Sequence, residues 1–485
     1  MENNIAKIKP EIVWKNFYAL TQIPRPSKRE GKAIEFVKEF GEKLGLETIV
    51  DHVGNVIIKK PATKGMENRK GVILQGHVDM VPQKNSDKVH DFEKDPIEAY
   101  VDGDWVTANG TTLGADNGIG VAAAMAILES TDLVHGPIEG LFTMDEETGM
   151  TGANELKAGV LDGDILMNLD SEDEGELYIG CAGGIDTSAT FDFTDEKPED
   201  NHKAYKIFVK GLKGGHSGLD IPLKRGNANL ILNSILKKGY EKFSLSLSKI
   251  NGGSLRNAIP REAYALVSIP REKDVSFIKL VKEIKAGFLD VLTDDQGLTI
   301  SLEEIEMPEK FINKVAFRNL FNSIENCPNG VVKMDDNMPD VVETSSNLAI
   351  VKSENNEIQV LSLQRSSSEE SKNQLCNELK ELFERNNAKV IQDGEYPGWM
   401  PNPNSAILNT MKKVYNDNFG KIPEVKVIHA GLECGILGAT YPNWDMISFG
   451  PTIRFPHSPD EKVNIESVDM FWKYLVKTLE NAPEK

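Results

Sequence analysis

Short apolar runs alternate with segments of helical periodicity over residues 45–185. Residues 10–20 and 30–45 carry apolar positions at helical spacing, and residues 71–78, GVILQGHV, predict a short buried strand. Strands that alternate with helices are typical of an α/β domain with a largely parallel central sheet. Ligands bind such sheets beyond the carboxyl ends of the strands, so this edge is where functional residues are expected.

The alternation of single strands with helices changes after about residue 186. The order of strand-like and helix-like segments over 186–396 predicts two consecutive βαββαβ-like units, an internal duplication without evident sequence identity. The α/β pattern returns at about residue 397 and ends in a helix over 465–481. We therefore predict an α/β domain, residues 1–185 and 397–485, interrupted by an α+β domain, residues 186–396.

Composition excludes several classes of function. A formal net charge of −20 argues against nucleic acid as a partner, because phosphate binding requires clustered Lys and Arg. The first twenty residues lack the apolar core of a signal peptide, and no stretch approaches the length of a transmembrane helix. The four cysteines are scattered and form no CxxC pair. We expect a cytoplasmic protein with free thiols and no contact with a membrane.

Five loops that end or closely follow apolar strands carry acidic residues or histidine. The residues are His77 and Asp79 in GHVDM, Asp116 in LGADNG, Glu146 and Glu147 in MDEETG, Asp170 in NLDSED, and His457 in FGPTIRFPHSP. On a parallel sheet these loops can converge on one edge although they are far apart in sequence. Two histidines with four or five carboxylates exceed the needs of one tetrahedral zinc ion but suit a two-metal site.

The spacing within the loops supports a division of roles. His77 and Asp79 are two positions apart, so Asp79 can accept a hydrogen bond from the imidazole nitrogen that does not face a metal. Glu146 and Glu147 are adjacent and must point apart. One of them can then ligate a metal while the other serves as a general base.

Each loop taken alone has a structural interpretation. Asp116 precedes a helix and could be an N-cap. The pair Glu146-Glu147 could form a solvated turn, Asp170 could belong to a surface run of acids, and His457 could be an ordinary loop histidine. The agreement of five loops in one topology favours the metal site.

Together the motifs GHVDMVP, LGADNGIG, MDEETGMTGA, NLDSEDEG and FGPTIRFPHSP resemble those of the co-catalytic zinc peptidase family that includes carnosinase and aminoacylase. The resemblance covers essentially the whole chain. It implies two zinc ions per chain, for which cobalt or manganese can substitute. It also implies that Asp116 bridges the two ions, Asp79 orients a ligand and Glu146 is the general base. The implied ligands are His77, Asp116 and Asp170 for one ion, and Asp116, Glu147 and His457 for the other.

The inserted domain resembles the lid of that family. The resemblance implies that His216 in GLKGGHSGLD reaches the substrate's carbonyl or carboxylate, and that Arg365 in SLQRSSSEES binds the carboxylate. Asn257 in RNAIPRE and Gly431 or His429 in HAGLECG, which we place in the α/β part, are further substrate-binding candidates. A glycine-flanked histidine can also simply mark a turn, and Arg365 can be a surface strand residue.

The resemblance implies a metallopeptidase that hydrolyses dipeptides, Xaa-His and others with a free C-terminal carboxylate. One alternative is an N-acyl amino-acid deacylase or carboxypeptidase with the same metal site. An alternative of another class is a non-catalytic binding protein on a degenerate peptidase fold. The expected partner is a small peptide, and the resemblance also implies a homodimer.

Overall fold

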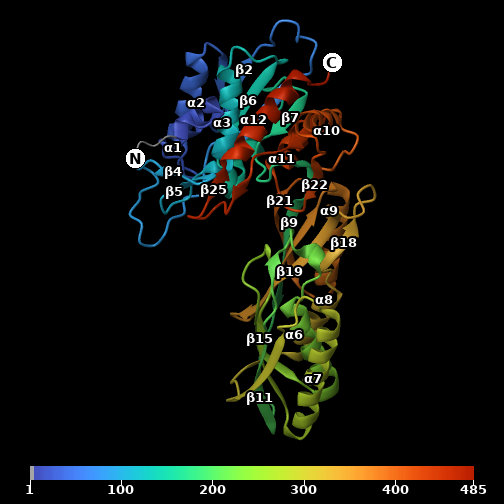
Figure 1. Cartoon of the computed structure of the whole chain (residues 1–485). Helices are drawn as coiled ribbons and strands as arrows, with labels where there is room; N and C mark the ends of the chain where they lie inside the picture. The colour runs from blue at the N-terminus through green and yellow to red at the C-terminus, as the bar shows by residue number, and fades with distance from the viewer. Residues whose placement is uncertain (1–4) are drawn as a thin grey trace. The chain divides into compact units, whose positions relative to one another are not determined.

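The computed structural model describes residues 5–485, which form two compact units (Figure 1). The α/β unit comprises the chain up to Gly180 with Trp399–Val427 and Leu432–Lys485. The lid unit comprises Cys181–Gly398 and Ile428–Gly431. The sequence analysis placed the boundaries at 185/186 and 396/397. It also placed the HAGLECG loop wholly in the α/β part, whereas the structure groups residues 428–431 with the lid unit.

An eight-stranded sheet in the order β1-β2-β6-β3-β7-β23-β8-β22 forms the centre of the α/β unit. Its strands are β1 Glu47–Val50, β2 Val56–Lys60, β3 Val72–His77, β6 Ile138–Thr143, β7 Ile165–Asn168, β8 Glu176–Cys181, β22 Glu424–Ile428 and β23 Asp445–Ser448. The four central strands β6, β3, β7 and β23 are parallel. Every residue of β3, β6 and β7 is buried, which explains their continuous apolar runs.

Helices and a small sheet complete the α/β unit. The helices are η1 Ile5–Lys7, α1 Glu11–Thr21, α2 Gly31–Lys43, α3 Ala115–Glu129, α4 Glu146–Gly149, α5 Thr151–Glu155, α10 Ala406–Phe419, α11 Glu433–Thr440 and α12 Ile465–Glu480. The small sheet has the order β24-β25-β5-β4, with β4 Ala99–Asp102, β5 Trp105–Ala108, β24 Ile453–Arg454 and β25 Lys462–Asn464. The sequence analysis did not predict the β4–β5 hairpin.

Helix α3 packs directly on strands β3 and β6. Its small residues permit this close approach, because a Cβ atom on Gly120 would lie 2.5 Å from the carbonyl oxygen of Leu169. A Cβ atom on Gly76 of β3 would likewise lie 2.3 Å from Oδ1 of Asn117. The first turn of α3 is therefore held tightly against the carboxyl ends of the central strands.

The lid unit contains a nine-stranded antiparallel sheet whose main path is β16-β11-β15-β13-β19-β20-β9-β21. Its strands are β9 Gly183–Asp192, β11 His202–Lys210, β13 Ser246–Gly252, β15 Ala263–Pro270, β16 Thr299–Ile305, β18 Gly330–Met334, β19 Val342–Glu354, β20 Glu357–Ser366 and β21 Lys389–Tyr396. Short pairs lie outside it: β10 Asp195–Glu196 with β17 Phe311–Ile312, and β12 Gly215–His216 with β14 Ala258–Ile259. The helices are η2 Ile221–Leu223, α6 Ala228–Phe243, η3 Arg271–Lys273, α7 Asp274–Val291, α8 Lys314–Asn326 and α9 Glu369–Arg385.

Two βαββαβ units make up this sheet, so the predicted fold class is confirmed, but the units are not consecutive. One is β11-α6-β13-β15-α7-β16, and the other is β9-α8-β19-β20-α9-β21. The first strand of the second unit, β9, thus precedes the whole of the first unit in the chain. The prediction of consecutive units was wrong because β9 pairs with β20 and β21, far along the chain, and local patterns carry no sign of such pairing.

Helices α6 to α9 pack on the lid sheet, and Figure 1 shows them beside its strands. Burial alternates along β11, so this strand presents one face to a hydrophobic core and the other to solvent. The core includes Ile207 and Val267 of the sheet and Leu232 and Phe317 of the helices. Within residues 5–485, no helix is long and apolar enough to cross a membrane.

Candidate metal centre

The carboxyl ends of the central parallel strands bring the predicted loops together. His77 is the last residue of β3, and Asp170 lies two residues beyond β7. Glu146 begins α4 shortly after β6, and Asp116 lies in the first turn of α3. His457 lies between β24 and β25 and has a positive φ of 57°.

Asp116 lies between two imidazole rings. Its Oδ1 is 3.2 Å from Nε2 of His77, and its Oδ2 is 3.1 Å from Nε2 of His457. Asp170 Oδ1 lies 3.4 Å from the same nitrogen of His77, and Glu147 Oε2 lies 3.0 Å from Nε2 of His457. The side chains therefore form two groups of three potential ligands that share Asp116: His77, Asp116 and Asp170 in one, and Asp116, Glu147 and His457 in the other.

Two ligand oxygens in this cluster accept no hydrogen bond from the described residues. They are the buried Glu147 Oε1 and Asp170 Oδ1, and the latter has only its ion pair with Nε2 of His77, at 3.4 Å. Burial of an unpaired carboxylate oxygen is costly unless a cation or proton compensates it. Oxygen and imidazole nitrogen donors in two groups of three, joined by a carboxylate, fit two divalent cations.

Asp79 supports the cluster but belongs to neither of the two ligand groups that share Asp116. Its Oδ1 lies 3.2 Å from Nδ1 of His77, which faces away from Asp116. Its two carboxylate oxygens also accept the backbone N–H groups of Glu146, at 3.0 Å, and Glu147, at 3.3 Å. One buried carboxylate therefore fixes both the ring of His77 and the turn that carries the paired glutamates.

The acids raise the pKa values of both histidines. Burial opposes a charge on His77, but Asp170, Asp116 and Asp79 outweigh it, so the pKa of His77 lies well above its ordinary value. Hydrogen bonds to Asp116 and Glu147 raise the pKa of His457 to about 11. Without a cation, the surrounding carboxylates therefore favour the protonated form of both imidazoles.

Burial also shifts the carboxyl groups. It raises the pKa of Glu146 to about 8 and the pKa of Asp170 well above its usual range. Burial acts in the same direction on Asp116, but the hydrogen bonds from His457 and His77 prevail and lower the pKa of Asp116. A perturbed set of this kind, gathered at one edge of a sheet, is typical of a catalytic site.

Two further groups of potential ligands lie close by. His77, Glu146 and Glu147 form one of them and overlap with the metal cluster, whereas the carboxylates Glu30, Asp79 and Asp145 have a structural explanation. Asp145 accepts hydrogen bonds from the hydroxyl groups of Thr148 and Thr151. Glu30 Oε1 accepts the backbone N–H groups of Lys28 and Asp145, each at 3.0 Å. These bonds shape the turn that leads into Glu146.

The predicted residues of the lid unit form a second cluster. His216 lies in β12, which pairs with β14 directly after Asn257. The backbone N–H of Ser217 donates to the carbonyl oxygen of Asn257 at 2.9 Å, and Arg365 Nε lies 3.4 Å from Oγ of the same serine. His429 Nε2 lies 2.7 Å from Oγ of Ser345, and a Cβ atom on Gly218 would meet the carbonyl oxygen of His429. Gly431 ends the same segment of the lid unit.

The hydrogen bonds of His216 define its tautomer. Its Nδ1 accepts the backbone N–H groups of Gly218 at 3.2 Å and Leu219 at 3.0 Å. Burial and the charge of Arg365 lower the pKa of His216, so the ring is neutral at neutral pH. The proton of the neutral ring therefore lies on Nε2, which can donate to an oxygen atom of a ligand.

The sequence analysis missed several supporting residues. Tyr396 accepts a hydrogen bond from Arg365 Nη1 at 2.7 Å and so holds the guanidinium. Glu433 is buried and accepts from Gln75 at 2.6 Å and Thr143 at 2.9 Å beneath the metal cluster. Glu433 lies in the HAGLECG motif, where its acidic side chain among apolar neighbours was the available signal. Tyr396 carries no such signal.

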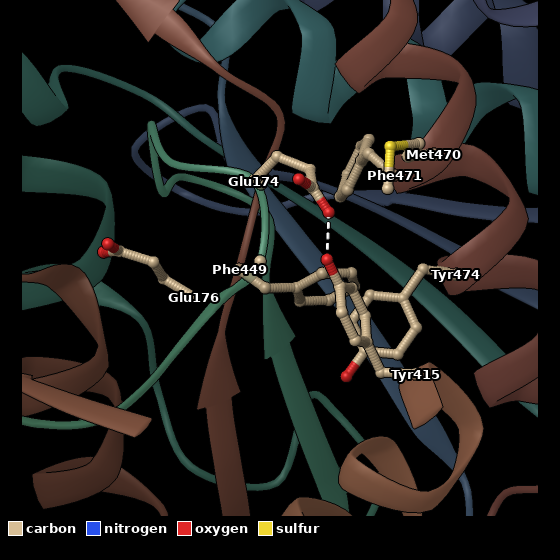
Figure 2. A pocket seen from close by; sticks show the side chains of 9 residues that line it. Glu174, Glu176, Tyr415, Phe449, Met470, Phe471 and Tyr474 are labelled. Atoms are coloured by element: carbon tan, nitrogen blue, oxygen red, sulfur yellow. Dashed lines mark hydrogen bonds between the residues drawn. The ribbon is translucent and has the colours of Figure 1, made fainter. Parts of the chain in front are cut away.

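A small cavity lies behind the loop that carries Asp170. Figure 2 shows Glu174 of this loop hydrogen-bonded to the hydroxyl of Tyr415, with Phe449 and Tyr474 alongside. The cavity measures about 10 Å³, which is room for one water molecule at most. These residues therefore pack helices α10 and α12 against the metal loops and do not form a substrate site.

Comparison with known proteins shows what the whole chain is similar to. The profile described as "Peptidase family M20/M25/M40" matches residues 73–481. The chain is 42% identical over 488 residues to the cytosol non-specific dipeptidase of Escherichia coli, with 100% of each chain covered.

The chain is also similar to proteins of known structure. The chain superposes on the crystal structure of an aminoacylhistidine dipeptidase from Vibrio alginolyticus with a TM-score of 0.97 and 46% identity, covering 100% of this chain and 99% of that chain. A tripeptidase from Staphylococcus aureus has a TM-score of 0.56 at 16% identity, covering 98% of this chain and 99% of that one, and shares the fold.

Proposed function

Because the chain belongs to peptidase family M20/M25/M40, we propose that it is a dipeptidase with a dinuclear metal centre at His77, Asp116, Glu147, Asp170 and His457. The observation that carries this proposal is the position of Asp116, whose two oxygens face the two histidines of separate ligand groups. Similarity over the full length to proteins named as dipeptidases supports the substrate class.

We assign zinc as the native metal. Imidazole nitrogen and carboxylate oxygen are ordinary zinc ligands, and three protein ligands per ion leave a position open for water or substrate. When bound, two divalent cations supply Lewis-acid chemistry: they acidify water and stabilise negative charge on oxygen. Cobalt and manganese accept the same donors and are expected to substitute.

Glu146 is the proposed general base. It belongs to neither group that contains Asp116, yet one of its potential ligand atoms lies within 4.8 Å of those of His77 and Glu147, so it is close to both proposed ligands. Its carboxylate takes a proton from the attacking water and later delivers it to the leaving amine of the scissile bond. Asp79 is proposed to hold the His77 ring and, through the backbone N–H of Glu146, the position of this base.

The lid unit supplies the proposed substrate contacts. Arg365 carries a fixed positive charge and a planar array of donors that suits the substrate's C-terminal carboxylate. Nε2–H of His216 is proposed to donate to the carbonyl oxygen on which negative charge develops. The exposed side chain of Asn257 and the backbone at Gly431 are further proposed contacts. A requirement for the carboxylate close to the cleaved bond favours short peptides.

A substrate panel tests this proposal against its alternatives. Purified protein loaded with zinc is assayed with Xaa-His and other dipeptides, tripeptides and N-acetyl amino acids, with release of free amino acid as the readout. We expect dipeptides to be cleaved at the highest kcat/KM, and chelation to abolish the activity. Preferred cleavage of N-acetyl amino acids would favour the deacylase alternative. Absence of hydrolysis with two metals bound would favour a binding protein.

Location and assembly follow from the same similarity. A cytosolic location is proposed because the Escherichia coli relative is named for the cytosol. A homodimer is proposed from the family resemblance, and light scattering of the purified protein tests it. Mixing variants inactive in Glu146 and in His216 then tests whether sites are shared between subunits.

A further inference from the structure

A carboxylate outside both ligand groups holds the turn that carries the bridging ligand. Glu461 lies four residues after His457 and is 1% exposed. Its Oε2 accepts the backbone N–H groups of Leu113 at 2.8 Å and Gly114 at 2.9 Å. Its Oε1 accepts those of Ala115 at 2.7 Å and Asp116 at 3.2 Å. One buried side chain thus binds four consecutive N–H groups.

A buried arginine contacts the same turn. Arg25 is 1% exposed and donates through Nη2 to the carbonyl oxygen of Gly114 at 2.5 Å. Its Nη1 donates to the carbonyl oxygens of Val78 at 3.0 Å and Asp79 at 2.9 Å, in the loop after β3. A Cβ atom on Gly114 would lie 2.6 Å from Nη2, so glycine is needed for this contact.

The segment that carries Glu461 is itself anchored. The hydroxyl of Thr107 donates to the carbonyl oxygen of Glu461 at 2.7 Å, and β25, which follows at Lys462, pairs with β5. Glu461 therefore links the segment that carries His457 to the turn that carries Asp116. Both His457 and Asp116 belong to the second ligand group, where Nε2 of His457 lies 3.1 Å from Oδ2 of Asp116.

Burial of two charged side chains is expensive, and a merely structural turn could be held by neutral groups. We propose that Glu461 is a positioning residue of the metal centre: by binding the Leu113–Asp116 turn it sets the direction of both Asp116 oxygens and their distance from His457. Arg25 holds the same turn to the loop of His77 and Asp79. This inference rests on the proposed dinuclear centre.

Glu461→Gln tests the proposal because it keeps the size of the side chain. The amide NH₂ then faces two backbone N–H donors without an acceptor, so the turn must move. Affinity for Zn²⁺ is measured by competition with a chromophoric chelator, and the visible spectrum of the Co²⁺-loaded protein reports ligand geometry. We expect metal affinity to fall at least about tenfold, the range typical of groups that orient ligands, with an altered Co²⁺ spectrum and a lower kcat at similar KM.

The matched control is Glu466→Gln, which removes the same charge at an exposed position in the first turn of α12. Its metal affinity, Co²⁺ spectrum and kcat should equal those of the parent protein. If Glu461→Gln yields no folded protein by circular dichroism, Glu461→Asp, which keeps the carboxylate but shortens its reach, receives the same measurements.

An unchanged metal affinity and Co²⁺ spectrum in a folded Glu461 variant would overturn the proposal. So would equal losses of thermal stability in the metal-free and metal-loaded forms without a change in affinity, because that result describes a purely structural residue. Metal binding is measured without substrate, so the outcome is independent of which substrate is cleaved. Failure of the parent protein to bind two ions would instead contradict the proposed dinuclear centre.

Discussion

The adjacent residues Glu146 and Glu147 illustrate how backbone geometry divides two identical side chains. Asp79 binds both of their N–H groups, yet only Glu147 reaches His457, at 3.0 Å. Glu146 stays outside both shared ligand groups, and burial raises its pKa to about 8. This pKa describes the metal-free cluster, in which Glu146 holds a proton at neutral pH. Two bound cations would lower it, because their charge favours the carboxylate form that a general base requires.

Replacement of Glu146 by Gln should separate metal binding from catalysis. We expect two bound ions, measured by atomic absorption, and a kcat about 10²–10⁴-fold below that of the parent protein, because the amide cannot accept the proton. Glu155→Gln, at an exposed position of α5, serves as the control and should keep full activity. Substantial turnover by Glu146→Gln would rule out its role as the base.

Elements position these residues, and the sequence predicted some elements better than others. His77, Glu147 and Asp170 could be located because each ends or closely follows an apolar run, and these runs proved to be β3, β6 and β7. The roles of Arg25 and Glu461 could not be predicted from the sequence, because their hydrogen bonds join residues that are 53 to 348 positions apart. The order of the two βαββαβ units within the lid unit was not predicted for the same reason. The strands that pair with β9 are remote from it in sequence.

Tight packing of α3 on the sheet predicts a sensitive glycine. In Gly120→Ala the new methyl group would lie 2.5 Å from the carbonyl oxygen of Leu169, next to the ligand Asp170. We expect the free energy of unfolding to fall by about 1–3 kcal/mol in urea denaturation. Gly287→Ala in helix α7 has nothing within 4 Å of the new atom and should instead gain ~0.5–1 kcal/mol. Equal effects of the two changes would contradict this account of α3.

At the scale of the whole molecule, the metal centre concentrates negative charge in a chain whose formal net charge is already −20. Without cations, protons compensate part of that charge. The pKa values of His77, His457 and Asp170 are all raised, so these groups hold their protons to a higher pH than they would in water. Metal ions and protons therefore compete for the same atoms.

The affinity for metal should consequently rise with pH. Because raised pKa values make protons compete with the ions for these ligands, each proton displaced adds about one unit to log K per pH unit, as long as the pH lies below the pKa of its group. Calorimetry in two buffers with different ionisation enthalpies counts the protons released on binding. Binding that neither releases protons nor changes with pH would show that the ligands are already deprotonated in the metal-free protein.

The position of β23 in the sheet has a consequence for how the protein is made. This strand, Asp445–Ser448, lies between β7 and β8, which are synthesised far earlier. At the usual ~5–20 residues per second, the nascent chain therefore waits on the order of tens of seconds with an incomplete sheet. Open strand edges invite pairing with other chains, so this interval is when the protein is most exposed to aggregation. Chaperone demand during translation, rather than the stability of the finished fold, is then expected to limit its yield.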